Sequence, residues 1–246
     1  MEGLPTTTGH LLNGRLTYRQ PETGFRSGIE PVLLAAAIPA RQGEHVLEAG
    51  SGAGAALLCL AARVPGVTGI GLEIDPALAA LANTNATANA MPGIGFHAAD
   101  ITASGHPGPF DHAFANPPYH PHSGTPSPCA PRATAKIAGS GTFPSWIGAL
   151  SRRLRARGTL TLILPATAVP ACLDALQSAG CGSPALMPLW PRAGRPAKLC
   201  LLQSVRGGRA AFRLFPGLVL HADTGFTEAA EAILRHALPL PFAPPD

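Results

Sequence analysis

Short apolar runs alternate along most of this chain with longer stretches of helical periodicity. Five runs have the length and composition of buried strands: 45–48, 67–73, 94–98, 110–115 and 159–164. Helices are expected over 28–38, 53–64, 76–90, 143–157, 169–179 and 227–237, several of them bounded by Pro or Gly. Strands that alternate with helices predict an α/β fold with a doubly wound, mostly parallel sheet, because parallel connections cross the faces of the sheet.

The last third of the chain departs from this alternation. Residues 185–189 and 198–205 are strand-like, and no convincing helix lies between them. Gly207-Gly208 predicts a turn that leads from the second strand into 210–215 and forms an antiparallel hairpin. The sheet is therefore expected to end in antiparallel C-terminal strands.

The first 27 residues are turn-rich and polar, which predicts a loose arm or lid in front of a core over 28–246. A length of 246 residues suits one α/β domain. Neither an internal repeat nor a clear domain boundary interrupts it. We expect a single domain over 1–246, as a monomer or a homodimer.

Composition excludes several classes of protein. Apolar residues make up 46% of the chain and charged residues 13%, which is typical of a globular protein and not of a disordered one. No apolar run is long enough to span a bilayer, and the N-terminus lacks the pattern of a secretory signal, so a cytoplasmic protein without a membrane partner is expected. The five cysteines lack C-x-x-C spacing and predict neither a metal site nor a disulfide framework.

A glycine-rich loop, Glu48-Ala-Gly-Ser-Gly-Ala-Gly54, lies between the first strand of the parallel sheet and its helix. Gly50, Gly52 and Gly54 let the backbone turn tightly and approach a ligand, and the helix N-terminus offers free N–H groups. The spacing also satisfies the dinucleotide fingerprint, so the loop alone does not separate NAD from another nucleoside.

Acidic residues at the ends of the next two strands extend this nucleoside pocket. Glu73 has the spacing of an acid that accepts hydrogen bonds from ribose hydroxyls. Asp75 competes for that role, but Asp75-Pro76 is better explained as a helix cap followed by Pro at the first helical position. Asp100 follows the third strand, where it either accepts a hydrogen bond from an adenine amine or forms a turn.

The segment Asn116-Pro117-Pro118-Tyr119 follows the strand 110–115. The Asn116 side-chain oxygen and the Pro117 carbonyl are two acceptors for the hydrogens of an exocyclic NH2 group, and Tyr119 offers a ring on which a flat molecule stacks. Accepting both hydrogens would shift a conjugated amine toward tetrahedral geometry and turn its lone pair toward an electrophile. The alternative is a Pro-rich turn that ends the strand, with Tyr119 packed.

The acid-x-Gly-x-Gly-x-Gly loop, the strand-end Glu73, Asp100 and Asn-Pro-Pro-Tyr together resemble the class I methyltransferases that use S-adenosylmethionine. The resemblance is closest to the tRNA adenine-N6-methyltransferases that act on valine tRNA next to the anticodon. It spans most of the chain and includes 18–31 and 216–220. Glu30 stands where that family would have Asp.

The resemblance implies a Rossmann-like, seven-stranded sheet and S-adenosylmethionine as the cofactor. It implies catalysis by Asn116, Pro117, Pro118 and Tyr119. The residues implied in cofactor binding are Glu48, Gly50, Gly52, Gly54, Glu73 and Asp100, with Arg26 and Gly28 from a Gly-Phe-Arg-x-Gly segment that lies beside the cofactor in the family.

The leading hypothesis is methylation of the 6-amino group of an adenine in tRNA. A net charge of +4, with basic clusters at 152–157, 192–198 and 206–213, is compatible with an RNA partner. The alternatives are the glutamine N5-methyltransferases of peptide-release factors, which share Asn-Pro-Pro-Tyr but usually have a longer N-terminal helical domain, and the rRNA guanine-N2 methyltransferases. An NAD-dependent oxidoreductase would not explain Asn116–Tyr119, and a noncatalytic RNA-binding module would not explain the pocket.

Overall fold

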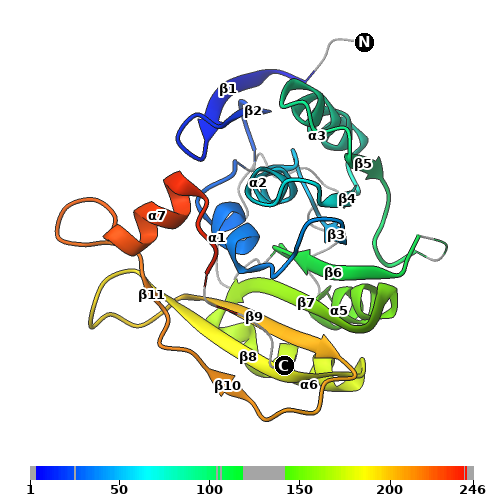
Figure 1. Cartoon of the computed structure of the whole chain (residues 1–246), viewed down its shortest axis with the longest axis vertical. Helices are drawn as coiled ribbons and strands as arrows, with labels where there is room; N and C mark the ends of the chain where they lie inside the picture. The colour runs from blue at the N-terminus through cyan, green and yellow to red at the C-terminus, as the bar shows by residue number, and fades with distance from the viewer. Residues whose placement is uncertain are drawn as a thin grey trace.

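One mixed sheet forms the centre of the molecule (Figure 1), in a computed structural model that describes residues 4–24, 26–103, 105, 107–118, 142–240 and 242. The long strands are β3 (His45–Ala49), β4 (Thr68–Glu73), β5 (Ile94–Ala98), β6 (Phe110–Ala115), β7 (Leu154–Pro165), β8 (Cys181–Trp190) and β9 (Leu199–Arg206). Their order across the sheet is β8-β9-β7-β6-β3-β4-β5, and the two-residue strands β10 (Arg213–Leu214) and β11 (Leu218–Val219) both pair with β8. The predicted doubly wound α/β fold with seven main strands is confirmed.

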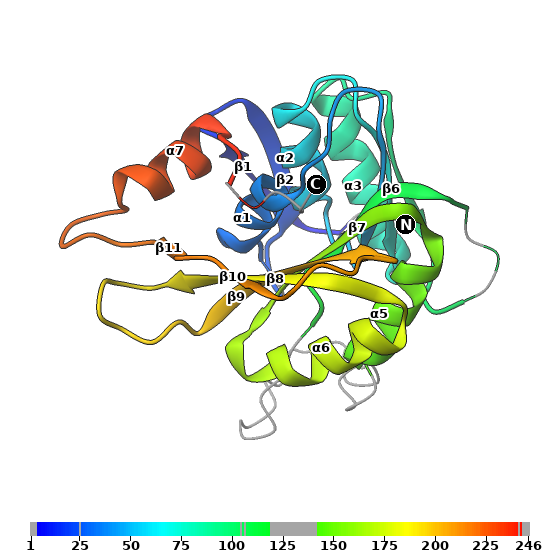
Figure 2. The same cartoon turned by 60° about the horizontal axis from the view of Figure 1, so that its bottom comes forward.

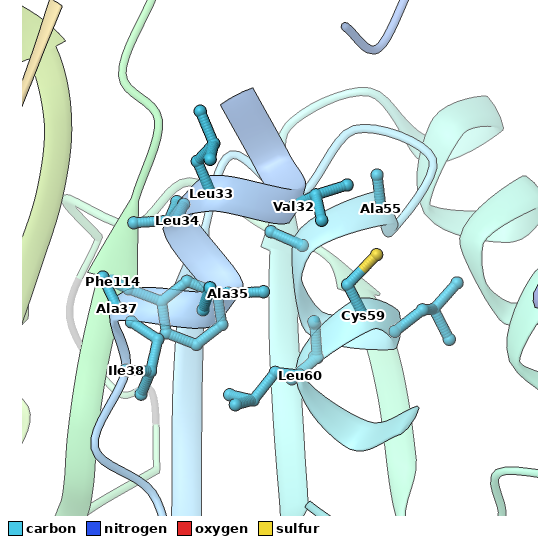
Figure 3. Close-up of a cluster of buried hydrophobic side chains, with 14 of the residues drawn as sticks. Val32, Leu33, Leu34, Ala35, Ala37, Ile38, Ala55, Cys59, Leu60 and Phe114 are labelled. Atoms are coloured by element: carbon cyan, nitrogen blue, oxygen red, sulfur yellow. The ribbon is translucent and has the colours of Figure 1, made fainter. Parts of the chain in front are cut away.

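Helices cover both faces of this sheet (Figure 2). They are α1 (Glu30–Ala37), α2 (Ala55–Arg63), α3 (Pro76–Ala88), α5 (Thr142–Arg153), α6 (Val169–Ser178) and α7 (Glu228–His236), with a 3-10 turn, η1, at Ala166–Ala168. One core packs α1 and α2 against the sheet, and Phe114 of β6 inserts beneath α1 (Figure 3). A second core packs α5 and α6 against the opposite face. Because both faces are covered, most residues of β3, β6 and β7 are buried and show no regular alternation of buried and exposed positions.

The predicted C-terminal hairpin is wrong. β9 is antiparallel to both β7 and β8, so both of its hydrogen-bonding edges are occupied. The segment after Gly207-Gly208 therefore cannot pair with β9, and β10 instead pairs in parallel with the free edge of β8, with Arg213 opposite Ala185. The helix expected over 143–157 also ends earlier, because α5 stops at Arg153 and β7 begins at Leu154.

Residues near the N-terminus, expected to form a loose arm, form an antiparallel hairpin of β1 (Thr6–Leu11) and β2 (Leu16–Pro21). The prediction of a loose segment is wrong because the polar sequence conceals apolar positions on β2: Leu16 and Tyr18 are buried. The hairpin is a separate two-stranded sheet and lies beside α3 (Figure 1). A role as a lid stays a prediction.

Two asparagines, one within α3 and one at its C-cap, hold this hairpin by its backbone. Asn85 accepts the Arg19 N–H at 2.9 Å and donates to the Arg19 carbonyl at 2.8 Å. One turn later Asn89 accepts the Thr17 N–H at 2.9 Å and donates to the Thr17 carbonyl at 2.8 Å. The spacing of the two asparagines fits the spacing of Thr17 and Arg19. Residues four apart on a helix share a face, and residues two apart on a strand share a side. We refer to Asn85 and Asn89 as the asparagine ladder.

The Asn89→Ala substitution is expected to lower the free energy of unfolding by about 1 to 2 kcal/mol, because the Thr17 N–H and carbonyl both lose their protein partner. Denaturant titration measures this change. Thr87→Ala, on the exposed side of the same helix, is the control and should change stability by less than about 0.5 kcal/mol. An Asn89 variant as stable as the wild type would contradict the role of the ladder.

Candidate functional site

The predicted site residues gather where four parallel strands end. Ala49 of β3 lies opposite Leu72 of β4 and Ala115 of β6, and Glu73 lies opposite Ala98 of β5. The next residues of each strand therefore leave the sheet at one edge. In parallel α/β sheets this carboxyl edge is where ligands bind.

The glycine-rich loop has the backbone that its sequence predicts. Gly50, Gly52 and Gly54 have φ angles of +66°, +54° and +92°, which disfavour a residue with a side chain. A Cβ on Gly50 would lie 2.7 Å from the Trp146 ring, whereas a Cβ on Gly52 would meet no atom within 4 Å. The space at Gly52 is thus open to a ligand, while Gly50 is closed by packing.

Ser51, between these glycines, is only 6% exposed, and its hydroxyl has no hydrogen-bond partner among the described residues. A buried hydroxyl without a partner costs free energy, and such groups in native structures often face a ligand or water. The open space at Gly52 and the unpaired Ser51 hydroxyl fit a polar ligand at this loop.

The Glu73 carboxylate fixes the loop. One of its oxygens accepts the Gly52 N–H at 2.8 Å, and the other accepts the Asp75 N–H at 3.0 Å. A carboxylate has about four lone-pair positions, so acceptor capacity remains for a hydroxyl donor. Asp75 caps α3 by accepting the Ala77 N–H at 2.8 Å, as predicted.

The Glu48 side chain is buried in β3 and accepts the Leu57 N–H of α2 at 3.2 Å. It thereby caps a helix whose own N-cap residue, Gly54, has no side chain for the purpose. Burial, partly offset by this hydrogen bond and reinforced by the charge of Glu73, raises the pKa of Glu48 to about 8. The sequence did not indicate this capping role.

Asn85 connects the hairpin to the glycine-rich loop. Besides its two bonds to Arg19, its amide donates to the Ala53 carbonyl at 2.9 Å, and Asn85 is 1% exposed. Asn89 makes no such contact with the loop, since its other bond goes to the Asn85 carbonyl. An Asn in the middle of a helix carries little signal by itself, and only the spacing to Asn89 could have suggested a paired role.

Asp100 and the acceptor motif lie at the same edge as the loop. Asp100 accepts both the backbone N–H and the hydroxyl of Thr102 at 2.8 Å, so it forms a turn directly after β5. Asn116 and Pro118 are half-buried and Pro117 is buried, immediately after β6. Tyr119 lies outside the described residues.

Arg26 and Gly28, the other two residues implied in cofactor binding, lie at the base of the hairpin. The exposed Arg26 guanidinium donates to the Thr7 hydroxyl at 3.1 Å and to the Pro21 carbonyl at 3.2 Å. Gly28 is exposed, and a Cβ there would lie 2.4 Å from Glu30. Their contact with a cofactor stays a prediction.

Two apolar residues beside the loop were missed. Ile74 follows Glu73 and is 48% exposed, which places a large apolar side chain against solvent at the carboxyl edge. Trp146 of α5 is 9% exposed and closes the space over Gly50. The apolar residue between two acids at a strand end was a usable signal for Ile74.

The described residues contain no group of three or more His, Cys, Asp or Glu side chains that could hold a metal ion. In the same part of the chain, no helix is both long enough and apolar enough to traverse a bilayer.

Comparison with known proteins identifies similar chains. A family model described as the methyltransferase small domain matches residues 30–136. The tRNA1(Val) (adenine(37)-N6)-methyltransferase of Dickeya chrysanthemi (strain Ech1591) is 28% identical over 212 residues, which cover 82% of this chain and 83% of that protein. The protein of the same name from Pseudoalteromonas translucida (strain TAC 125) is 30% identical over 62% of this chain and 66% of its own length.

A release factor glutamine methyltransferase of Rhodospirillum rubrum is 38% identical over 79 residues, which cover 32% of this chain and 24% of that protein. Among solved structures, a predicted O-methyltransferase of Agrobacterium tumefaciens superimposes with a TM-score of 0.72 at 23% identity, covering 85% of this chain and 97% of that one. This last likeness concerns the fold.

Glu48 predicts a pH dependence of folding. Its pKa is raised from 4.5 to about 8, so the folded protein binds the proton more tightly than the unfolded chain. Its contribution to stability is full below pH 4.5 and is lost as the pH rises through 8. Glu48→Gln keeps an acceptor for the Leu57 N–H and has no carboxyl to titrate. As the pH is raised from roughly 5 to 7, its free energy of unfolding relative to that of the wild type should therefore increase by about 2 to 3 kcal/mol. Urea titrations at several pH values measure the difference; a constant difference would show that Glu48 titrates normally.

The fold, the loop with its open side at Gly52, and the matched family model agree with one another. The chain is a class I methyltransferase that uses S-adenosylmethionine, and it is similar to the tRNA1(Val) adenine-N6-methyltransferases.

Proposed function

We propose that this enzyme methylates the 6-amino group of an adenine in tRNA. The observation that carries the proposal is the position of Asn116 and Pro117 at the end of β6, beside the strand whose end forms the glycine-rich loop. The two relatives named as tRNA1(Val) adenine-N6-methyltransferases support this acceptor, and the first of them is similar over most of both chains.

The cofactor supplies an electrophilic methyl group on a sulfonium centre. The open side of the glycine-rich loop at Gly52 would receive the nucleoside part of this cofactor, and Glu73 would accept hydrogen bonds from its ribose hydroxyls. The exposed Ile74 side chain offers apolar surface to a flat ring next to that ribose. The buried Glu48 carboxyl would lose its proton readily beside a cationic ligand, because an opposite charge nearby favours the ionised form.

Asn116 and Pro117 would orient the acceptor. Their two oxygens accept the hydrogens of the amine, so the nitrogen lone pair is directed toward the methyl group. Proximity, orientation and the electrostatic stabilisation of the developing positive charge on nitrogen would account for the catalysis. The C–N bond would form as the C–S bond of the sulfonium breaks, leaving a neutral thioether, and the methylated amine would then release one proton to water. Tyr119 would stack on the base.

Release-factor glutamine is the second candidate acceptor, because its side-chain amide is also a planar NH2 group. The release factor methyltransferase match is higher in identity, but it covers only about a third of this chain. The acceptor is tested by labelled methyl transfer to total tRNA, rRNA and release factor in parallel, followed by nucleoside and amino-acid analysis. Label in N6-methyladenosine of tRNA is the expected result, and label only on protein would overturn the proposal.

Asn116→Ala is expected to reduce methyl transfer roughly 100-fold or more, the usual effect of removing a group that stabilises the transition state. The affinity for S-adenosylmethionine, measured by calorimetry, should remain unchanged because Asn116 is proposed to contact the acceptor. Asn116→Asp keeps an acceptor oxygen and should lose less activity. An alanine variant with nearly normal turnover would refute the role of Asn116.

Asn85→Ala should weaken S-adenosylmethionine binding about 5-fold, because the Ala53 carbonyl in the glycine-rich loop loses its donor and one hydrogen bond contributes about 1 kcal/mol. Asn89→Ala is the matched control, since it loosens the same hairpin without touching the loop. Calorimetric titration of both variants separates the two effects. Equal loss of affinity in the two would mean that only the hairpin matters.

A further inference from the structure

An open hollow of about 510 Å³ lies where β8 passes into the loop that leads to β9. It is lined by Trp190, Ala193, Gly194, Arg195, Pro196 and Val219. We call it the Trp190 hollow. Neither the glycine-rich loop nor the acceptor motif contributes to it.

The hollow has one large aromatic wall that is held in place. The Trp190 indole N–H donates to the Pro216 carbonyl at 3.1 Å. Gly217 lies against the same ring, and a Cβ there would be 2.4 Å from the indole nitrogen. The 216–217 backbone thus supports the indole, which remains partly exposed and lines the hollow.

The loop that carries the hollow is rich in positive charge, and one of its cations, Arg195, lines the hollow. Arg192, Arg195 and Lys198 are all exposed, and no acidic residue occurs between Trp190 and Lys198. An aromatic ring next to cationic side chains is the combination that binds unpaired nucleotides, because the ring stacks on a base and the cations neutralise phosphates.

The loop around the hollow is tied at three points. The Arg195 N–H donates to the Arg192 carbonyl at 3.2 Å, and the Arg192 guanidinium donates to the Ala222 carbonyl. At its far end, the Lys198 carbonyl accepts the Ala166 N–H at 2.9 Å, which joins the loop to the end of β7. These bonds favour a preformed hollow, and a preformed site loses less entropy on binding.

The hollow lies at the same edge of the sheet as the acceptor motif. β8 is antiparallel to β9, β9 is antiparallel to β7, and β7 is parallel to β6, so β6 and β8 end on the same side. Three strand spacings separate them, which is roughly 14 Å at about 4.8 Å each. A nucleotide in the hollow is therefore a different one from the nucleotide that is methylated.

We infer that the Trp190 hollow binds an unpaired base of the RNA substrate, with Trp190 stacking on the base and Arg195 contacting an adjacent phosphate. The inference rests on the proposed RNA substrate and adds a second point of recognition to it. Two separated contacts would fix the register of a tRNA loop on the enzyme, which a single base in the acceptor site cannot do.

The test is steady-state methylation of bulk tRNA by the full-length enzyme at saturating S-adenosylmethionine. Trp190→Leu and Arg195→Ala should each raise the KM for tRNA about 5-fold or more, the lower range for one base stack, and leave kcat and cofactor affinity unchanged. Trp190→Phe keeps an aromatic face and should restore most of the affinity. In Arg195→Ala the slope of log KM against log salt should fall by about 0.7, the contribution of one phosphate contact to a single strand.

Arg41→Ala is the matched control, because this exposed arginine precedes β3 at the opposite edge of the sheet, lies outside the three basic clusters, and its loss changes the net charge equally. Thermal unfolding of each variant separates misfolding from lost binding. If wild-type enzyme methylates tRNA and the Trp190 and Arg195 variants match Arg41→Ala, the hollow has no role while the proposed function stands. If the wild type neither binds nor methylates tRNA, the proposed function and this inference both fail.

Discussion

The parallel pairing of β3 with both β4 and β6 brings the parts of the candidate site to one edge of the sheet. The pairing aligns Ala49 with Leu72 and Ala115, so the three strands end at the same edge of the sheet. The glycine-rich loop, Glu73 and Asn116 are the residues that follow. None of them needs to be brought together by a separate interaction, and the apolar strands that carry them are fixed by packing on both faces. A shift in register by one residue would separate the two halves of the site.

The same strands explain why the positions of so many candidate site residues were predictable. Gly50, Gly52, Glu73 and Asn116 are fixed by local sequence, because each directly follows an apolar run whose direction is set by the alternation of strands and helices. The links between them were not predictable in this way. Asn85 is 32 residues from Ala53, and its role depends on a hairpin whose polar sequence hid the buried Leu16 and Tyr18. Long-range hydrogen bonds by single polar side chains leave no periodic signal.

The C-terminal strands show a different limit. Gly207-Gly208 has the composition of a hairpin turn, and locally the chain does turn there, with the Gly208 N–H donating to the Val205 carbonyl at 2.9 Å. Whether the following segment pairs with β9 depends on the neighbours that β9 already has. β7 and β8 occupy both edges, so the competition between strands overrides the local preference. Which strands pair depends on the whole sheet, and the local sequence of one segment gives little information about its partner.

The asparagine ladder has a consequence for how the surface of this enzyme can diversify. Asn85 and Asn89 contact β2 through its peptide groups, so these four hydrogen bonds do not depend on which side chains the outer side of that strand carries. Arg19 of β2 is exposed, and exchanging its side chain would leave every bond of the clamp in place, because the clamp binds only its backbone N–H and carbonyl. Related enzymes could therefore alter the charge and shape of the outer side of this hairpin, while the glycine-rich loop keeps the same support from Asn85.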